Sequence, residues 1–174
     1  HKNKKTIYLK EKKMLQPPRK YRMITPQVTI SGPLTPASID VVKQTGCRKI
    51  VTIGGGFLHP DVVPHIKENQ MEVVYYPFPD CSEVNEVQES LSRVHNQIQH
   101  LIKKGSRVHV VGDVSLTDIA CIVGALRKTQ GWSLGNILSE AIDISDGVET
   151  SDLITAIHNF EPNPQSNPFS TENN

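Results

Sequence analysis

Short apolar strands alternate with helical segments along most of this chain, and this alternation restricts the fold more than any other feature. Runs rich in β-branched residues are followed by segments in which apolar residues recur every three or four positions, the spacing of one helix face. The pattern predicts strands at 28–31, 49–53, 72–78 and 107–111, and helices at 37–44, 62–66, 84–104, 118–130, 133–142 and 151–160. Strand–helix–strand repeats form parallel sheets. We therefore expect an α/β fold with a central sheet of four or five mostly parallel strands, flanked by helices.

The length of the chain fits one domain with flanking segments. Of its 174 residues, 37% are hydrophobic and 21% are charged, which is enough apolar material for a single core. The longest apolar run, 119–126, is far shorter than the ~20 residues that cross a bilayer, so we expect no membrane span. We expect the folded domain to cover 17–160, with a flexible basic segment at 1–16 and a disordered tail rich in Pro, Asn and Ser at 161–174.

Charge is distributed unevenly along the chain. Residues 1–22 hold nine lysines and arginines against one glutamate, a net charge of +8, whereas the remaining 152 residues hold ten basic and seventeen acidic side chains, a net charge of −7. A basic segment of this kind binds an acidic protein surface, anionic lipid or nucleic acid, or is simply solvated. Lys10, Lys12 and Lys13 are its candidate contacts to an acidic partner surface, and nothing in the pattern indicates a specific nucleic-acid site.

The cysteines point to a reducing compartment. Cys47, Cys81 and Cys121 are scattered and odd in number, so they form neither a disulfide framework nor a Cys-x-x-Cys motif. No signal-peptide pattern opens the sequence. We expect a cytoplasmic protein in which Cys47 and Cys121 are buried thiols, whereas Cys81 is either inert or a redox-sensing thiol.

Residues 107–132 have the layout of an anion site, a strand followed by a short turn and a helix N-terminus. The helix after the turn resembles the one that follows the active loop in the plant-and-fungal atypical dual-specificity phosphatases. The matching residues are Cys121, Gly124, Arg127, Lys128, Gln130, Trp132, Ser133, Leu134 and Glu140. Looser matches upstream are Ser31-Gly32-Pro33, residues 50–53 and Phe78-Pro79-Asp80. The resemblance implies a cysteine-phosphatase-like fold.

The resemblance also implies that the reactive residues are missing. In that family the loop carries a nucleophilic Cys and a phosphate-binding Arg, and these fall on Gly112 and Asp118 of this chain when no gap is introduced. A second register, in which His109 takes the place of the family His, puts Val110 and Leu116 at the reactive positions and needs a two-residue insertion in the helix. Both registers lack the nucleophile and the Arg. The degenerate loop consists of Gly112, Asp113, Val114, Ser115, Leu116, Thr117 and Asp118.

Other candidate residues have weaker patterns. Asp80 lies where the family has a general acid, and without a nucleophile it is a vestigial candidate or a turn residue. His59, Asp61 and His65 have no recognised metal spacing and are interrupted by prolines, so we expect a loop there. The three glycines at 54–56 lack the spacing of a dinucleotide-binding turn. We expect neither a metal nor a cofactor.

The sequence therefore predicts a catalytically inactive phosphatase-like protein, a pseudophosphatase. The resemblance extends to the fungal oxidant-induced cell-cycle arrest group, which implies a regulatory or scaffold subunit in a hetero-oligomer with phosphatase-like relatives, in an oxidative-stress or cell-cycle response. Val114 and Leu116 are the apolar loop residues expected to be exposed for such contacts. The alternative is a residual phosphatase, or a module that binds inositol pyrophosphates or phosphoproteins, in which a remodelled loop and the basic N-terminal segment supply the positive charge.

Overall fold

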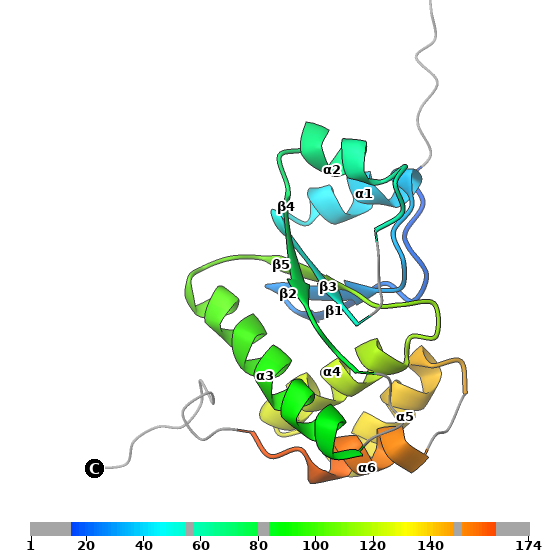
Figure 1. Cartoon of the computed structure of the whole chain (residues 1–174), viewed down its shortest axis with the longest axis vertical. Helices are drawn as coiled ribbons and strands as arrows, with labels where there is room; N and C mark the ends of the chain where they lie inside the picture. Colours follow the sequence, from blue (N-terminus) through cyan, green and yellow to red (C-terminus); the bar gives the residue numbers. More distant parts are fainter. Residues whose placement is uncertain (1–14, 55–57, 80–83, 148–150, 163–174) are drawn as a thin grey trace, which may run out of the picture.

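The computed structural model describes residues 15–54, 58–79, 84–147 and 151–162 (Figure 1). The strands are β1 (Arg22–Thr25), β2 (Val28–Ser31), β3 (Lys49–Ile53), β4 (Glu72–Tyr76) and β5 (Val108–Val111). The helices are α1 (Pro36–Gln44), α2 (Val63–Glu68), α3 (Val84–Lys103), α4 (Thr117–Thr129), α5 (Leu134–Ile144) and α6 (Ser151–Asn159). No helix among these described residues is both long and apolar enough to span a membrane.

The strands form one sheet in the order β1-β2-β5-β3-β4. β2, β5, β3 and β4 are parallel, and β1 pairs antiparallel with β2 at one edge. The predicted α/β fold with a mostly parallel sheet is confirmed. The sequence pattern did not locate β1, because Arg22–Thr25 is short and lacks a run of β-branched residues. The strand predicted at 72–78 ends earlier, at Tyr76, and is followed by Pro77, which cannot donate to a sheet.

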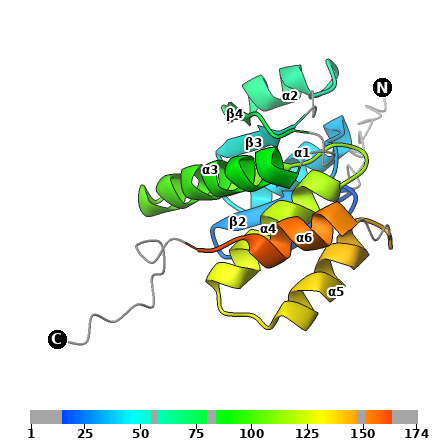
Figure 2. The same ribbon diagram turned by 60° about the horizontal axis from the view of Figure 1, so that its bottom comes forward.

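Helices cover both faces of the sheet (Figures 1 and 2). α1 and α2 cover one face, where Ile39, Val42 and Ile66 pack on Ile50 of β3. α3, α4, α5 and α6 cover the other face and enclose the larger core. The 3-4 apolar repeat of α3 is explained by this packing, since Val87, Leu91, Val94 and Ile98 are all buried.

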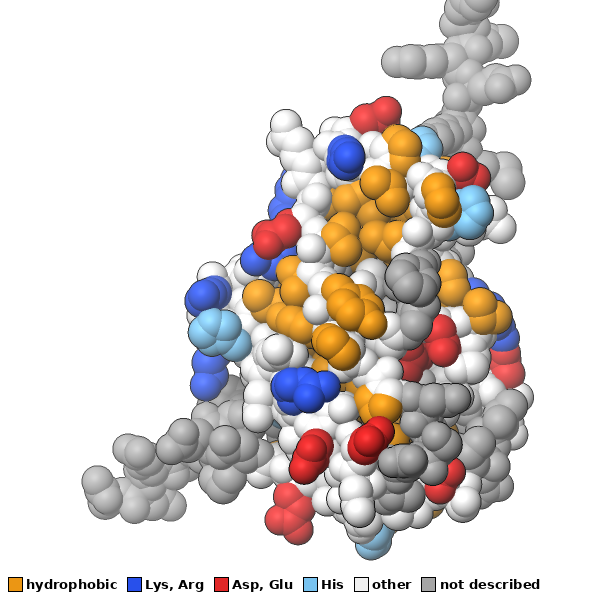
Figure 3. Space-filling view, viewed as in Figure 1, with side chains coloured by type: hydrophobic (Ala, Val, Ile, Leu, Met, Phe, Trp, Pro, Cys, Tyr) orange, Lys and Arg blue, Asp and Glu red, His pale blue; other side chains and the backbone are white. Residues whose placement is uncertain are grey.

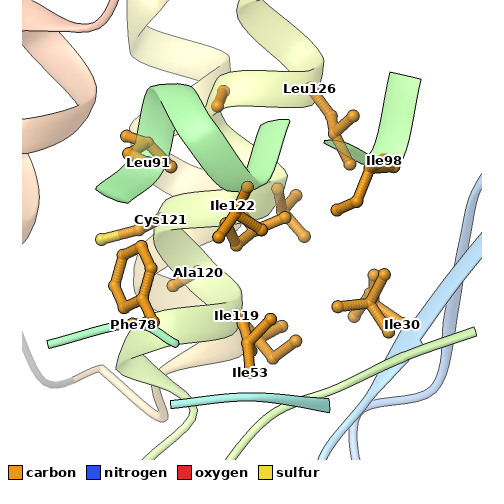
Figure 4. Packing of buried hydrophobic residues seen from close by; sticks show 14 of the residues in the cluster. Ile30, Ile53, Phe78, Leu91, Ile98, Ile119, Ala120, Cys121, Ile122 and Leu126 are labelled. Carbon is orange, nitrogen blue, oxygen red and sulfur yellow. The ribbon is translucent and has the colours of Figure 1, made fainter. Parts of the chain in front are cut away.

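α4 is the most deeply buried helix of the second layer. Every residue from Asp118 to Leu126 is buried, because the sheet, α3, α5 and α6 all pack against this helix. Figure 4 shows its Ile119, Ala120, Cys121 and Ile122 directed into the core beside Phe78, Leu91 and Ile53. A helix that is apolar on all sides belongs in such a position.

The residues that carry the phosphatase resemblance tie α4 to its neighbours. Arg127 forms a bidentate ion pair with Glu140 of α5, with Nε–Oε1 at 2.8 Å and Nη2–Oε2 at 3.1 Å, and its guanidinium lies 4.0 Å from the centre of the Trp132 ring. Arg127 and Gln130 also donate to the carbonyl oxygen of Ile24 in β1, at 3.1 and 3.3 Å. These residues therefore hold β1 and α5 against the C-terminal end of α4.

Two further motif residues fix the turns of this layer. Lys128 Nζ donates to the carbonyl oxygens of Ile157, His158 and Phe160, which are left unpaired at the end of α6. Ser133 Oγ accepts from Asn136 N–H and caps α5, as its sequence position predicts. The motif thus has a structural role in this chain that does not depend on any reaction.

Gly124 allows α4 and α6 to approach closely. A Cβ atom at this position would lie 2.8 Å from both Cδ1 and Cγ1 of Ile157, which is closer than van der Waals contact permits. Ile157 itself is fully buried, so it has little room to move.

We therefore expect Gly124→Ala to destabilise the fold by about 1–3 kcal/mol, in spite of the better helix propensity of Ala. Urea unfolding of the full chain measures this loss. Adding Ile157→Val should recover part of it, because the smaller side chain relieves the overlap. Gly135→Ala is the control, since a Cβ there meets nothing within 4 Å. Equal stability of Gly124→Ala and the parent chain would contradict the close approach.

Candidate active-site loop

The loop 112–117 connects β5 to α4 at the carboxyl end of the parallel strands. This is the edge at which ligands bind in open α/β sheets. Gly32, after β2, and Gly54, after β3, lie at the same edge and approach the loop closely. The topology therefore brings the predicted loop to the place where an active site would be.

Gly112 has no room for a side chain. A Cβ atom built on its backbone would overlap Cγ1 of Ile119 and would lie 2.9 Å from Asp118 Oδ1. Ile119 is fully buried and points into the core, as Figure 4 shows. The space directly above the end of β5 is therefore filled by the first turn of α4.

Several backbone donors of the loop are paired with nearby carboxylates. Asp113 Oδ1 accepts from Ser115 N–H at 2.9 Å, from Ser115 Oγ at 2.7 Å and from Leu116 N–H at 3.0 Å. Asp118 accepts from Ile119 N–H at 2.7 Å and from Asp113 N–H at 3.3 Å. Free N–H groups at such a turn bind anions. Here an internal carboxylate already occupies the acceptor position.

Asp118 is buried at the centre of this arrangement, with only 6% of its surface exposed. Its Oδ2 lies 3.1 Å from the position that a Cβ at Gly54 would take. Burial, and secondarily the Asp113 carboxylate, raise the pKa of Asp118 from 3.8 to about 7, although the N–H groups of Ile119 and Asp113 favour its ionised form. Near neutral pH this side chain therefore exists in both protonation states.

The expectation that Leu116 is exposed is wrong. Leu116 is completely buried and adopts a left-handed backbone conformation, with φ 60° and ψ 9°, at the N-terminus of α4. This conformation turns its side chain inward, where Cδ2 lies 3.0 Å from the position that a Cβ at Gly32 would take. Val114, by contrast, is 74% exposed, as predicted.

The basic segment contributes one cation to the rim of the loop. Arg19 Nη1 donates to the Val114 carbonyl at 3.4 Å, and its guanidinium also pairs with Asp146. Lys20 and Arg22 form ion pairs at the end of α5, with Asp146 and Asp143 respectively. These three basic residues are therefore used in internal contacts. Lys10, Lys12 and Lys13 lie outside the described residues.

The other candidates from the sequence are not brought to the loop. Asp80 and Cys81 lie outside the described residues, whereas Cys47 and Cys121 are buried thiols, as predicted. His59 and Asp61 are exposed neighbours, with Nδ1 and Oδ2 3.3 Å apart. In the described part of the chain, no group of three or more His, Cys, Asp or Glu side chains is arranged to hold a metal ion.

His109 of β5 is the centre of a polar cluster that the sequence did not indicate. Its Nδ1 lies 2.8 Å from Thr29 Oγ1 and its Nε2 lies 2.8 Å from Ser31 Oγ, and the ring stacks on Tyr21. Because Ser31 Oγ donates to the Gly32 carbonyl, it accepts the Nε2 proton, which assigns the neutral tautomer. Complete burial lowers the pKa of His109 to about 3. The cluster holds β2 to β5 and offers no accessible nucleophile.

Comparison with known proteins identifies the architecture. No protein-family model matches the chain, and no curated protein matches its sequence. Solved structures do match. The core catalytic domain of the PP-IP phosphatase SIW14 from S. cerevisiae, in complex with citrate, superimposes with a TM-score of 0.73 at 13% identity, over 85% of this chain and 89% of that chain. The chain has the cysteine-phosphatase fold.

Two further structures with the cysteine-phosphatase fold are similar to this chain. Tk-PTP in its active form has a TM-score of 0.60 at 21% identity, over 79% of this chain and 93% of its own. The human tyrosine phosphatase-like serine/threonine/tyrosine-interacting protein has a TM-score of 0.58 at 13% identity, also over 79% and 93%. The structural neighbours are thus tyrosine- and dual-specificity-phosphatase-like proteins, and at these identities the likeness concerns the fold.

The raised pKa of Asp118 makes stability depend on pH. The folded state binds the carboxyl proton of Asp118 more tightly than the unfolded chain does. The resulting stabilisation of the folded state is complete below about pH 4 and is lost as the pH rises through about 7. We expect Asp118→Asn to gain stability relative to the parent chain as pH rises, by up to about 4 kcal/mol. Urea unfolding at several values between about pH 5 and pH 8 measures the difference.

The difference in unfolding free energy between Asp118→Asn and the parent chain isolates the contribution of Asp118. His109 has the opposite effect, because its lowered pKa costs stability as pH falls, and it is present in both proteins. Asp61→Asn, which removes an exposed carboxylate far from the loop in sequence, is the matched control. If Asp118→Asn and the parent chain have parallel pH profiles, Asp118 is not buried as described.

Proposed function

We propose that this protein is a pseudophosphatase, a catalytically inactive member of the plant-and-fungal atypical dual-specificity phosphatase group. The observation that carries the proposal is the filled space above Gly112, where Ile119 and Asp118 occupy the volume that a nucleophilic side chain would need. A glycine supplies no nucleophile, and its surroundings leave no place for one.

The charge of the loop supports the same proposal. A phosphate dianion needs donors and cations around it, whereas this loop presents the carboxylates of Asp113 and Asp118 to its own N–H groups. At ~4 Å and an effective dielectric constant of ~20, an ionised carboxylate repels a unit negative charge of the phosphate by roughly 4 kcal/mol. Arg19 is the described basic residue nearest to the basic N-terminal segment. It pairs with Asp146 and does not face the interior of the loop. Phosphate binding is therefore disfavoured together with catalysis.

A protein of this kind acts through its surface. We propose a regulatory or scaffold role with phosphatase-like relatives in the cytoplasm, in an oxidative-stress or cell-cycle response, as the sequence resemblance implies. The exposed Val114 on the loop rim and the basic N-terminal segment are its candidate contacts.

The first test is an assay of phosphate release from p-nitrophenyl phosphate and from an inositol pyrophosphate. We expect no release above a buffer control, and no thermal stabilisation by phosphate or vanadate. Asp118→Asn is the matched control, because any genuine activity of the loop would change in that variant. Phosphate-dependent stabilisation that disappears when residues 1–15 are deleted would instead favour the alternative, a phosphoryl-binding module.

A rebuilt loop tests the steric argument. We expect the double variant Gly112→Cys/Asp118→Arg to bind no vanadate, because the new cysteine Cβ overlaps Ile119. Adding Ile119→Ala removes the overlapping Cγ1 atom, and adding Asp113→Ser removes the competing carboxylate. Vanadate binding by the double variant alone would contradict the filled space above Gly112.

Substitutions of Val114 and Leu116 should have different effects on stability. Leu116→Ser removes a fully buried side chain and should cost about 2–4 kcal/mol of stability, whereas Val114→Ser should leave stability within about 0.5 kcal/mol of the parent chain. Thermal unfolding of both variants measures this. If Leu116→Ser is tolerated as well as Val114→Ser, the loop is open and the proposed filled site is wrong.

A further inference from the structure

The two edges of the sheet differ in how they are protected. At the β1 edge, the Ile24 carbonyl accepts from Arg127 and Gln130, so side chains of α4 cover it. At the β4 edge, the hydrogen bonds of the described residues go to β3 and to the ends of the strand. An exposed edge strand with unpaired N–H and C=O groups is a template for pairing with another chain.

The register shows which groups of β4 face outward. Glu72 N–H donates to Arg48 O and Tyr76 O accepts from Gly54 N–H, so the backbone groups of these two residues face β3. Because the direction alternates along a parallel strand, the N–H and C=O groups of Val73 and Tyr75 point away from the sheet. In the described part of the chain, neither residue has a backbone hydrogen bond on that side.

The side chains of the same two residues are exposed and apolar. Val73 is 43% exposed and Tyr75 is 56% exposed, and both lie on the face that α1 and α2 cover. Tyr75 Oη donates to the Gly54 carbonyl at 2.8 Å, which leaves its ring on the surface. Figure 3 shows hydrophobic side chains gathered along β4 and beside α2 on this side of the molecule. Natural edge strands usually carry charges that prevent such contacts.

We propose that β4 pairs with β4 of a second copy of this chain, antiparallel and about a two-fold axis at Val74. In this register the outward-facing N–H and C=O groups of Val73 hydrogen-bond with those of Tyr75 of the second copy. Tyr75 pairs with Val73 of the second copy in the same way. Val73 and Tyr75 then become cross-strand neighbours on one face, a β-branched residue against an aromatic one, which is a favourable pair. The two sheets become continuous, and the contact is isologous, as a closed dimer requires.

Charge on the opposite face of β4 is complementary in the same register. Glu72 and Tyr76 point toward α3, where Tyr76, Arg93, Asn96, Gln97 and His100 line an open hollow. The two-fold axis places Glu72 of the second copy directly opposite Tyr76, at the rim of this hollow. Arg93 is held there by hydrogen bonds to the Pro77 carbonyl and Ser90 Oγ, both neutral acceptors, at 3.2 Å. Within each chain Glu72 Oε2 lies 3.1 Å from Lys49 Nζ, so the Arg93 guanidinium adds a second cation beside the incoming carboxylate.

The hollow also contains an unpaired acceptor. Gln97 Oε1 is buried and has no hydrogen-bond partner among the described residues. A buried acceptor without a donor costs stability. The short strand limits the contact area, so the dimer belongs to the weak class, with a dissociation constant in the micromolar range. This inference does not depend on whether the loop is catalytic.

Sedimentation of the full chain between about 1 and about 200 µM tests the dimer. We expect a reversible monomer–dimer equilibrium. Amide hydrogen exchange measured by NMR at both ends of this range tests the strand, because the outward N–H groups of Val73 and Tyr75 should be protected only at high concentration. The N–H of Val74, which faces β3, should be unaffected.

Paired charge variants test the register. Val73→Lys/Tyr75→Lys places like charges opposite each other twice, whereas Val73→Lys/Tyr75→Glu places opposite charges there and removes the same two apolar side chains. We expect the second variant to dimerise at least about tenfold more tightly than the first. An equimolar mixture of Val73→Lys/Tyr75→Lys with Val73→Glu/Tyr75→Glu should form heterodimers, although neither forms a homodimer. Circular dichroism of each variant verifies the fold.

Four outcomes would overturn the proposal. The first is a chain that remains monomeric to about 200 µM, and the second is a dimer whose affinity is the same in both charge variants. The third is protection that rises with concentration at amides outside β4 and not at those of Val73 and Tyr75. Association only with a phosphatase-like relative, with no self-association, would also overturn it and would assign the edge to a hetero-partner.

Discussion

Complete burial of α4 is the constraint on which the rest of this structure depends. A helix enclosed by a sheet and three other helices cannot shift along its axis without breaking contacts on every side. Arg127 and Lys128 fix its C-terminal end to β1, α5 and α6, and Gly124 brings α6 within van der Waals contact. The position of the first turn of α4 follows from these contacts. That turn forms one wall of the candidate site.

The loop at this wall is built to be stable without a ligand. In an anion-binding loop, several backbone N–H groups converge on an empty space, and they remain unpaired until the anion arrives. Asp113 and Asp118 supply acceptors for these groups from within the loop, and Ile119 and Leu116 fill the volume with apolar atoms. The cost of this arrangement is a buried carboxyl group, whose raised pKa reduces its charge near neutral pH. The groups that stabilise the loop therefore pair with the same N–H donors that an anion would need.

Local patterns predicted the layers of the fold, whereas contacts between distant residues decided the site. The 3-4 repeat of α3 and the β-branched runs of β3 and β5 depend only on which side chains are buried, so the sequence was sufficient for them. β1 is short and mixes polar with apolar residues, and only its pairing with β2 makes it a strand. The sequence resemblance predicts that Gly112 stands in place of the nucleophile, and this remains a prediction. The inward turn of Leu116 was not visible in the sequence, because it depends on a left-handed residue next to Gly32.

The two edges of the sheet differ in how much the fold depends on them. Arg127 and Gln130 cover β1 with the same residues that secure α4, so that edge cannot be opened without loosening the core. β4 carries no such duty, since its inner groups pair with β3 and its outer groups contribute nothing to the fold among the described residues. Apart from the hydrogen bond of Tyr75 Oη to the Gly54 carbonyl, the fold depends little on the side chains of Val73 and Tyr75, and yet both positions hold large, mainly apolar side chains. Solubility alone would favour charged residues at these positions. A contact with another chain therefore explains the apolar side chains on this edge strand better than the fold does.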